Sequence, residues 1–332
     1  MRMPEARRVV VITGASAGVG LSTARRFADE GAAIGLLARG EDRLEAAARE
    51  IKEAGSEALA VPVDVSDAEA VEVAATRVEE ELGPIDVWVN NAMATVFAPV
   101  AELTHEEFRR VTEVTYLGSV WGTMAALRLM RPRDRGTIVQ VGSALAYRGI
   151  PLQSGYCGAK HALQGFLDSL RTELMHDGSG IRVTAVHLPA LNTPQFGWGR
   201  TKMTRAPQPV APIFQPEVAA EAVVWAASNP RREVWVGWPT VRAILVDKLA
   251  PGLLDRRLAR TAYDAQQLDE LVSAERPDNL FEPVAGEFAA HGRFDGRAKG
   301  RSLQLWLTMN SGRLGVGATA LAAAVLATRR RG

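Results

Sequence analysis

A serine, a tyrosine and a lysine in one segment have the types and the spacing for proton transfer. Ser143 is followed thirteen residues later by Tyr156, and Lys160 comes four residues after that. If this part is helical, residues at i and i+4 share a face, so the Lys160 ammonium lies beside the Tyr156 phenol. A phenol titrates near ~10 when unperturbed, and a fixed cation lowers that pKa toward neutrality. Ser143 is placed to hydrogen-bond a reacting carbonyl or alcohol. The alternative is an ordinary surface pair of tyrosine and lysine, and the surrounding elements decide between the two.

A glycine-rich turn near the start of the chain predicts a phosphate site. Residues 8–13 are largely β-branched and predict a buried strand, and Gly14, Gly18 and Gly20 follow before a stretch of helical periodicity. Glycines let the backbone approach a ligand closely, and a helix N-terminus offers free amides and a positive dipole end. Three residues separate the first two glycines, which departs from the usual dinucleotide fingerprint. The alternative is a plain strand-to-helix connection.

The end of the second predicted strand bears on the choice of cofactor. Residues 32–38 form this strand, Arg39 follows it, and the first acidic residue is Glu41. In doubly wound nucleotide-binding folds an acid near this point holds the adenosine ribose, whereas an arginine accommodates a 2′-phosphate. The sequence therefore favours NADP over NAD, with a solvent-facing arginine as the alternative.

Strands and helices alternate along the next part of the chain. Asp64 lies at the end of the third strand, where it is placed to meet an adenine amino group, and Thr104 caps a long helical stretch toward Arg131 that is interrupted around residues 116–118. This alternation predicts an α/β fold, a Rossmann-like doubly wound parallel sheet of about seven strands with helices on both faces. The candidate residues all fall at the carboxyl ends of strands, where such sheets bind ligands. The further strands are expected at residues 59–65, 85–90, 137–141, 181–188 and 233–237.

Composition narrows the class of protein. The 332 residues carry 39 Lys plus Arg against 38 Asp plus Glu, so the net charge of +1 gives no footprint for nucleic acid. Cys157 is the only cysteine, which excludes an internal disulfide and a cysteine-based metal cluster, and no metal site is expected. The N-terminus shows no signal-peptide pattern, so a cytoplasmic enzyme is expected.

Taken together, the motifs resemble the classical short-chain dehydrogenase/reductase family over about the first 240 residues. Residues 13–20 resemble its cofactor turn, Asn90, Asn91 and Ala92 its asparagine motif, and residues 189–193 the stretch that closes over the nicotinamide. The resemblance implies that Tyr156 is the general acid in reduction and the general base in oxidation. It implies that Lys160 lowers the tyrosine pKa and binds the nicotinamide ribose, and that Ser143 orients the substrate oxygen. The cofactor supplies the hydride.

The resemblance also assigns the cofactor-binding residues. They are Gly14, Ser16, Gly18, Val19, Gly20, Arg39, Asp64, Val65, Asn91, Ala92, Tyr156, Lys160, Pro189 and Thr193. Three positions depart from the family pattern. Thr115 replaces the asparagine that commonly holds a water linked to the lysine, which puts a water-relay role at this catalytic position in doubt. Met93 and Ala190 replace glycines. The family usually forms dimers or tetramers, so a homodimer or homotetramer is expected.

The rest of the chain is expected to be an extension, with residues 1–240 as the catalytic domain and 241–332 beyond it. Residues 192–214, with Phe196 and Trp198, fall where the family places its substrate lid; these aromatics either contact substrate or pack. Residues 240–260 predict a helix broken at Pro251 and Gly252, and residues 275–300 an irregular segment. The apolar run 314–328 is short of the ~20 residues that span a bilayer, so packing on the body or a partner is favoured over membrane contact.

The function expected from the sequence is an NADP(H)-dependent oxidoreductase that acts on a secondary alcohol, ketone or aldehyde. One alternative is a non-catalytic NAD(P)-sensing protein, which the presence of Ser143, Tyr156 and Lys160 disfavours. The other is a membrane-surface lipid or steroid reductase with peripheral membrane association through its tail.

Overall fold

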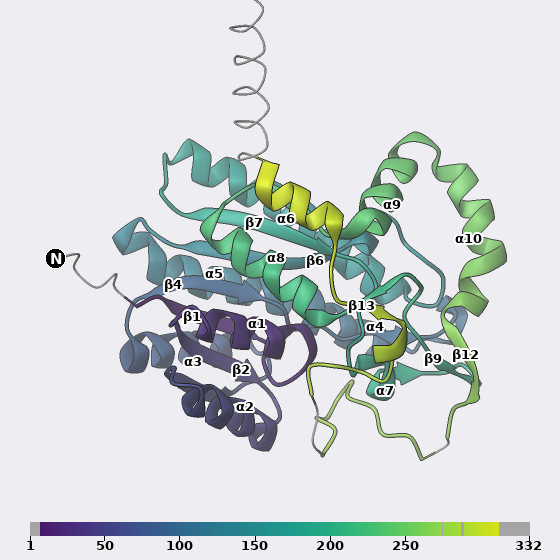
Figure 1. Cartoon of the computed structure of the whole chain (residues 1–332), viewed down its shortest axis with the longest axis horizontal. Coiled ribbons are helices and arrows are strands. Elements are labelled where there is room, and N and C mark those ends of the chain that lie inside the picture. Colours follow the sequence, from purple (N-terminus) through teal and green to yellow (C-terminus); the bar gives the residue numbers. More distant parts are fainter. Residues whose placement is uncertain (1–6, 274, 287–288, 312–332) are drawn as a thin grey trace, which may run out of the picture.

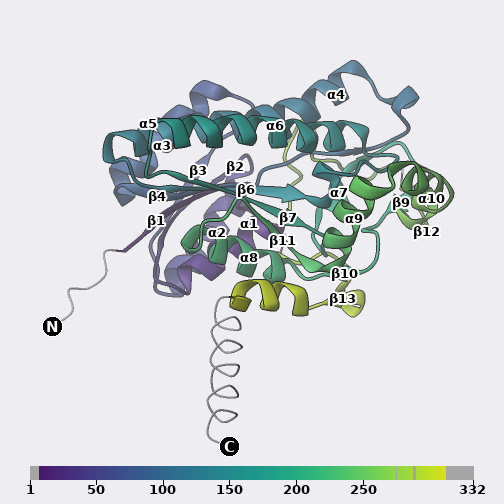
Figure 2. The same cartoon turned by 90° about the horizontal axis from the view of Figure 1, so that it is seen from above.

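A seven-stranded parallel sheet forms the centre of the protein. The computed structural model describes residues 7–273, 275–286 and 289–311. The strand order is β11-β7-β6-β4-β1-β2-β3, and every neighbouring pair is parallel. Helices cover both faces of this sheet (Figure 1, Figure 2). The predicted Rossmann-like fold is therefore confirmed.

The elements follow the predicted alternation closely. The strands of the large sheet are β1 Val9–Thr13, β2 Ala33–Ala38, β3 Ala58–Pro62, β4 Ile85–Asn90, β6 Thr137–Ser143, β7 Arg182–Leu188 and β11 Glu233–Trp235. The helices are α1 Gly18–Ala28, α2 Glu41–Glu53, α3 Ala68–Leu82, α4 His105–Thr112, α5 Gly118–Met130, α6 Ser154–His176, α7 Gln195–Trp198, α8 Pro216–Ser228, α9 Gly237–Leu249 and α10 Pro251–Ala265.

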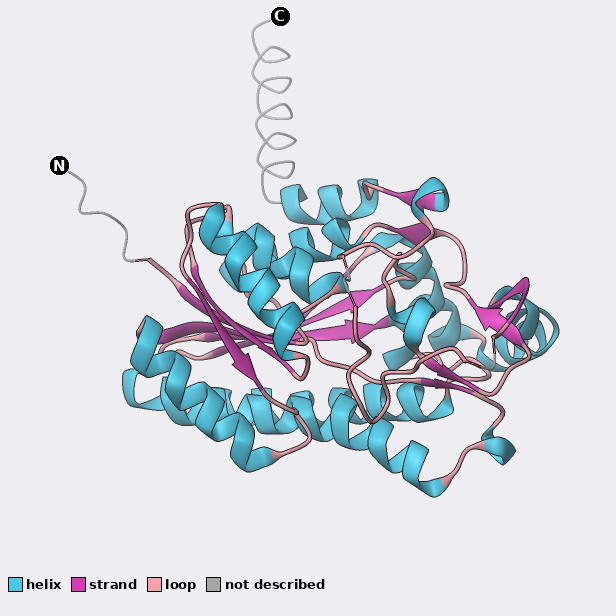
Figure 3. Cartoon of the chain, turned by 90° about the horizontal axis from the view of Figure 1, so that it is seen from below, coloured by secondary structure: helices cyan, strands magenta, loops and turns pink. Residues whose placement is uncertain are grey.

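The sheet separates two hydrophobic cores. Val10 and Ile12 of β1 pack in the core shared with α1, α2 and α8, whereas Val9 and Val11 pack in the core shared with α3, α5 and α6. Successive side chains of a strand point to opposite faces, so one buried apolar strand serves both cores. The view from below shows the same arrangement of helix, sheet and helix (Figure 3).

Two local features refine the sequence-based expectations. The long helix is interrupted by a π-helical turn, Glu113–Leu117, between α4 and α5, and a capping box of Thr104 and Glu107 starts α4. The strand expected to reach Val65 ends at Pro62. Beyond it the Asp64 side chain accepts hydrogen bonds from the Ser66 amide and hydroxyl, which fixes a turn there instead of extended strand.

The C-terminal extension begins as predicted, with α9 and α10 separated at Ala250, and residues 275–300 are mostly irregular in their described part. Two short strands of the extension pair with two short strands that precede α8. β12 Gln267–Leu271 pairs with β9 Arg205–Pro207, and β13 Ala298–Lys299 pairs with β10 Ile213–Phe214. Leu280 packs in the core of α3, α5 and α6, and Leu305 packs in the core of α1, α2 and α8. The division at residue 240 stays a prediction.

The apolar run 314–328 lies outside the described residues. Among the helices that are described, none has the length and the apolar character needed to cross a membrane.

Candidate active site

The glycine turn joins β1 to α1 and leaves no room for a side chain at Gly14 or Gly20. A Cβ on Gly20 would lie 2.1 Å from the carbonyl oxygen of Gly14, and a Cβ on Gly14 would lie 2.9 Å from the Cα of Ala92. Asn91 fixes the turn from the end of β4, because its Nδ2 donates to the carbonyls of Thr13 at 2.9 Å and Gly14 at 3.2 Å. The backbone at the start of α1 can therefore approach an anion closely, as the sequence predicts.

A cavity runs from this turn along the carboxyl ends of β1, β2, β3 and β4. Most of the predicted cofactor residues lie on its wall. They are Gly14, Ser16, Gly18, Val19, Arg39, Asp64, Val65, Asn91, Ala92 and Thr193. Gly20 lies under the turn, and Pro189 follows β7. The wall also includes Trp198, which the sequence analysis named for substrate contact or packing, and Arg43, Asn279 and Pro283, which were not identified from the sequence.

Three arginines gather at the far end of this cavity. Arg110 of α4 forms an ion pair with Asp64 and donates to Ser66 Oγ at 2.7 Å. Burial opposes ionisation of Asp64, but the hydrogen bonds from Arg110 and Ser66 outweigh it and lower the pKa of this carboxyl. Burial and the charge of Arg110 lower the pKa of Arg39, and burial and the charge of Arg39 lower the pKa of Arg43. The arginine end thus has more positive than negative charge and suits an anion.

The catalytic candidates lie where β6 ends and α6 begins. Ser143 is the last residue of β6, and its Oγ accepts a hydrogen bond from the Leu145 amide at 3.1 Å. Tyr156 and Lys160 lie one turn apart on α6, with the Lys160 Nζ 5.6 Å from the centroid of the Tyr156 ring. Lys160 is buried, and its Nζ donates to the Val141 carbonyl at 2.8 Å. The structure therefore brings the three side chains together.

Burial controls the pKa values of this group. It raises the pKa of Tyr156, and the hydrogen bond with Ser143 opposes it without cancelling it. The sequence-based expectation that the pKa of Tyr156 is lowered is therefore wrong in sign. Burial also lowers the pKa of Lys160 to about 8. Both changes favour the neutral forms, because a charge loses its hydration when it is buried.

Thr115 lies in the π-helical turn, and its hydroxyl is occupied by the backbone. Its Oγ1 accepts from the Ala94 amide at 3.0 Å and donates to the Ala94 carbonyl at 3.0 Å. A hydroxyl has one proton to donate, and here the Ala94 carbonyl takes it. Thr115 thus ties α4 and α5 to the loop after β4, and its hydroxyl has no proton left to donate to a water.

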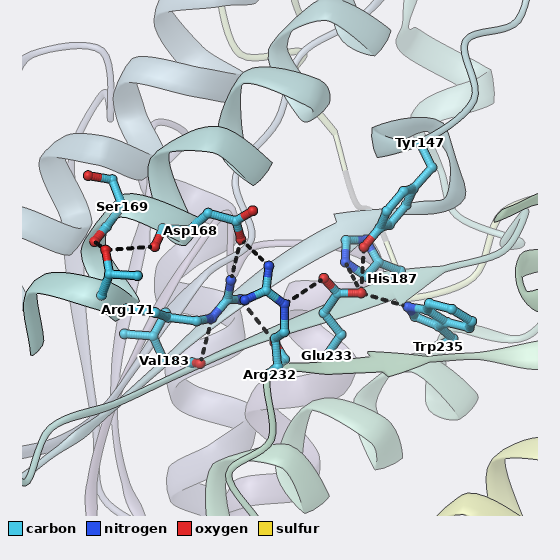
Figure 4. Close-up of polar contacts among 10 residues, drawn as sticks. Tyr147, Asp168, Ser169, Arg171, Val183, His187, Arg232, Glu233 and Trp235 are labelled. Carbon is cyan, nitrogen blue, oxygen red and sulfur yellow. Dashed lines mark hydrogen bonds and ion pairs between the residues drawn. The ribbon is translucent and has the colours of Figure 1, made fainter. Parts of the chain in front are cut away.

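Figure 4 shows a polar network that the sequence did not reveal, in which Glu233 lies among Tyr147, His187 and Trp235. His187 of β7 is 1 % exposed, and its Nδ1 lies 3.1 Å from the Ser143 carbonyl oxygen. Because a carbonyl only accepts, Nδ1 carries the proton. Burial lowers the pKa of His187 to about 4, against the opposing charge of Glu233. Glu233 in turn accepts hydrogen bonds from Tyr147 and Trp235. Through the hydrogen bond from His187, the network restrains the backbone of Ser143.

The two lid aromatics have different surroundings. Phe196 of α7 is buried against Phe97 and Phe294, with ring centroids 6.0 Å apart in both pairs. Trp198 lies on the cavity wall, and the Arg43 guanidinium lies 5.3 Å from the centroid of its ring. Phe196 is thus a packing residue, whereas Trp198 covers the cavity.

Within residues 7–273, 275–286 and 289–311, no group of His, Cys, Asp and Glu is arranged to hold a metal ion.

Comparison with known proteins gives a consistent result. The family described as short chain dehydrogenase matches residues 8–202. An uncharacterized oxidoreductase of Bacillus subtilis, YxnA, is 35% identical over 290 residues, which cover 87% of this chain and 80% of that protein. The cis-4-hydroxycyclohexanecarboxylate dehydrogenase of Sinomonas cyclohexanicum is 38% identical over 231 residues, or 68% of this chain and 90% of that protein.

A solved structure is similar over a comparable share of the chain. The alcohol dehydrogenase of the archaeon Thermococcus sibiricus, complexed with 5-hydroxy-NADP, superposes with a TM-score of 0.60 at 32% sequence identity. The match covers 69% of this chain and 96% of the archaeal chain.

Proposed function

The chain belongs to the short-chain dehydrogenase family and is an NAD(P)-dependent oxidoreductase, and from this premise we propose that it transfers a hydride between NADP(H) and a secondary alcohol, ketone or aldehyde. The observation that carries the choice of NADP is Arg39, which stands directly after β2 on the cavity wall, where an acid would hold the ribose of NAD.

The residues present fit a dinucleotide. A side chain at Gly14 would run into Ala92 and Asn91, and one at Gly18 would lie against Thr193 on the cavity wall. Glycine at both positions keeps the backbone before and at the N-terminus of α1 open to a ligand. At the other end, Arg39 and Arg43 lie on the cavity wall, and their pKa values are lowered first by burial and then by repulsion from a neighbouring arginine, Arg110 for Arg39 and Arg39 for Arg43. A doubly charged 2′-phosphate would relieve that repulsion and accept charge-assisted hydrogen bonds from the guanidinium groups. An unphosphorylated ribose would do neither.

Tyr156 is the proton donor in the proposed reaction. When bound, the cofactor supplies or accepts the hydride. A phenol is protonated at neutral pH, and burial does not change this for Tyr156, so it can donate a proton to the alkoxide that develops as a carbonyl is reduced. Ser143 lies in hydrogen-bond contact with that phenol and can hold the same substrate oxygen. The Lys160 ammonium, beside the ring, stabilises the phenolate that remains.

The relatives support this class of reaction. The archaeal enzyme is named as an alcohol dehydrogenase and was crystallised with an NADP analogue. The Sinomonas enzyme is named for a cyclic hydroxycarboxylate. Both names describe oxidation at a carbon that carries a hydroxyl group.

Tyr156→Phe tests the proposal, because it removes the acidic hydroxyl and keeps the ring. A panel of ketones and aldehydes is first screened with the wild type and NADPH. On any substrate that is turned over, the variant should lose about 100-fold or more in kcat, the scale of general acid catalysis. Its affinity for NADPH should change little. Retained turnover by Tyr156→Phe would overturn the assignment of the proton donor.

A further inference from the structure

We propose that residues 276–283 of the C-terminal extension (the strap) position Arg39 for the 2′-phosphate of NADP and so help to set the cofactor preference. This inference rests on the proposed function, and it gives a role to a part of the chain that lies beyond the family match at residues 8–202. The strap runs beside the outer end of the cavity and contributes Asn279 and Pro283 to its wall.

Backbone carbonyls of the strap hold the Arg39 guanidinium directly. Its Nη1 donates to the carbonyls of Phe281 at 2.6 Å and Leu280 at 3.4 Å, and its Nη2 donates to the carbonyl of Asn279. Carbonyl groups restrain an arginine without carrying a negative charge, so the cation keeps its charge for an anionic ligand. Asp64, the acidic residue on the same wall, pairs with Arg110, and the charges of Asp64 and of Glu282 in the strap act on Arg39 through space.

The strap is anchored in the body of the protein by Leu280. This side chain is 0 % exposed and packs in the core of α3, α5 and α6. The Leu280 carbonyl also accepts a hydrogen bond from Arg110 Nε at 3.0 Å, and the Leu280 amide donates to Asp278 Oδ1 at 3.0 Å. The buried Leu280 side chain therefore fixes the position of the neighbouring carbonyls that accept hydrogen bonds from Arg39.

The same strap is joined to the substrate lid. Arg276 donates from Nη1 to the Gly199 carbonyl at 2.7 Å and from Nη2 to the Phe196 carbonyl at 3.0 Å. The Asn279 amide donates to the Trp198 carbonyl at 3.1 Å. A shift of the strap would thus move both α7 and the support of Arg39.

Restraint of Arg39 has a direct consequence for binding. A long arginine side chain loses rotamer entropy when a phosphate fixes it, and this loss weakens binding. The strap has already taken that freedom in the protein alone, and its carbonyls accept from Nη1 and from one N–H of Nη2. The 2′-phosphate therefore meets an oriented guanidinium whose Nε–H and second Nη2–H remain to donate. NADH lacks the phosphate and gains much less from the same restraint.

Leu280→Ala tests this in the full-length protein, because it removes the anchor and leaves the carbonyls and Arg39 chemically intact. We expect the Kd for NADPH, measured by fluorescence titration, to rise about tenfold and the Kd for NADH less than about twofold, since part of a charge-assisted hydrogen bond is lost. Arg276→Gln removes the hydrogen bonds to the Gly199 and Phe196 carbonyls and leaves the hydrophobic core intact. It should likewise weaken NADPH binding more than NADH binding.

A double-mutant cycle separates positioning from general damage. In an Arg39→Ala background, Leu280→Ala should leave the Kd for NADPH within about twofold of Arg39→Ala alone, because the strap then has nothing to hold. Leu174→Ala is the matched control, a buried leucine of α6 in the same hydrophobic core. It should lower thermal stability without changing the NADPH preference.

The outcomes distinguish this inference from the proposed function. If the wild type prefers NADPH and Leu280→Ala retains that preference, or if NADPH binds the variant more tightly, the strap does not position Arg39. Additive effects of Arg39→Ala and Leu280→Ala would also overturn it. If the wild type shows no preference for NADPH, the choice of NADP fails and this inference fails with it.

Discussion

The buried ammonium of Lys160 should lower the free energy of unfolding of the protein, and the lowered pKa of Lys160 gives the size of this effect. The side chain is 2 % exposed, and burial lowers its pKa from 10.5 to about 8. At about 1.36 kcal/mol per pKa unit, holding the ammonium in this site costs roughly 3 kcal/mol. Replacing it with methionine removes that cost but also removes the hydrogen bond to the Val141 carbonyl, worth about 1 kcal/mol. Lys160→Met should therefore raise the free energy of unfolding at pH 7 by roughly 2 kcal/mol.

The pH dependence gives the prediction its sign. The folded-state pKa lies below the unfolded value, so between about pH 8 and pH 10.5 the unfolded chain binds more protons than the folded one. The cost of Lys160 is thus fully present below about pH 8 and disappears as the pH rises toward 10.5. The advantage of Lys160→Met should shrink across that interval.

Urea unfolding at pH 7 and pH 9.5, without nucleotide, measures this difference. Lys52→Met, at an exposed lysine of α2, is the control and should change stability little at either pH. If Lys160→Met is less stable than the wild type at pH 7, or if its advantage is the same at both pH values, burial does not govern this lysine.

Two further predictions concern His187, which contacts the Ser143 carbonyl, and Arg39 on the cavity wall. His187→Leu should remove the hydrogen bond to the Ser143 carbonyl and destabilise the fold by about 1 to 3 kcal/mol, the cost of an unsatisfied buried group. His187→Asn, whose amide can donate from the same position, should recover much of this. Because the folded-state pKa of His187 is lowered to about 4, wild-type stability should fall as the pH drops from 6.5 toward 4, and His187→Asn should lose less over that range in urea unfolding; equal losses would contradict the role assigned to its burial. Arg39→Asp should weaken NADPH binding by about 100-fold or more, since a charge-assisted pair becomes a repulsion, while NADH binding changes far less; equal weakening of both nucleotides in a fluorescence titration would exclude Arg39 as the 2′-phosphate contact.

The sequence predicts the parts of this site that lie at strand ends. Ser143 follows β6, Arg39 follows β2 and Asn91 follows β4, and the ends of parallel strands meet at one edge of the sheet. The i and i+4 spacing similarly places Lys160 beside Tyr156 once the segment is helical. These residues could be identified because local pattern and sheet topology together fix where they lie.

Other features depend on contacts between distant segments that leave no local pattern. Arg110 pairs with Asp64 from a different helix, His187 supports Ser143 from the neighbouring strand, and the carbonyls of residues 279–281 reach Arg39 from the far end of the chain. The sign of the pKa shift at Tyr156 also depends on burial, which spacing alone does not give.

Several expectations from the sequence stay predictions. They are the assembly into a homodimer or homotetramer, the cytoplasmic location, the site assignments beyond their placement, and a body-packed or partner-packed tail at residues 314–328. The matched family model and the relatives identify the class of reaction, and the substrate remains to be found by screening.

The most direct test of the account is a fluorescence titration of the purified wild-type protein with NADPH and NADH. Saturable binding of both, with NADPH clearly tighter, is the result expected from the glycine turn together with Arg39. Equal affinity would contradict the role of Arg39, and binding of neither nucleotide would contradict the proposed function itself.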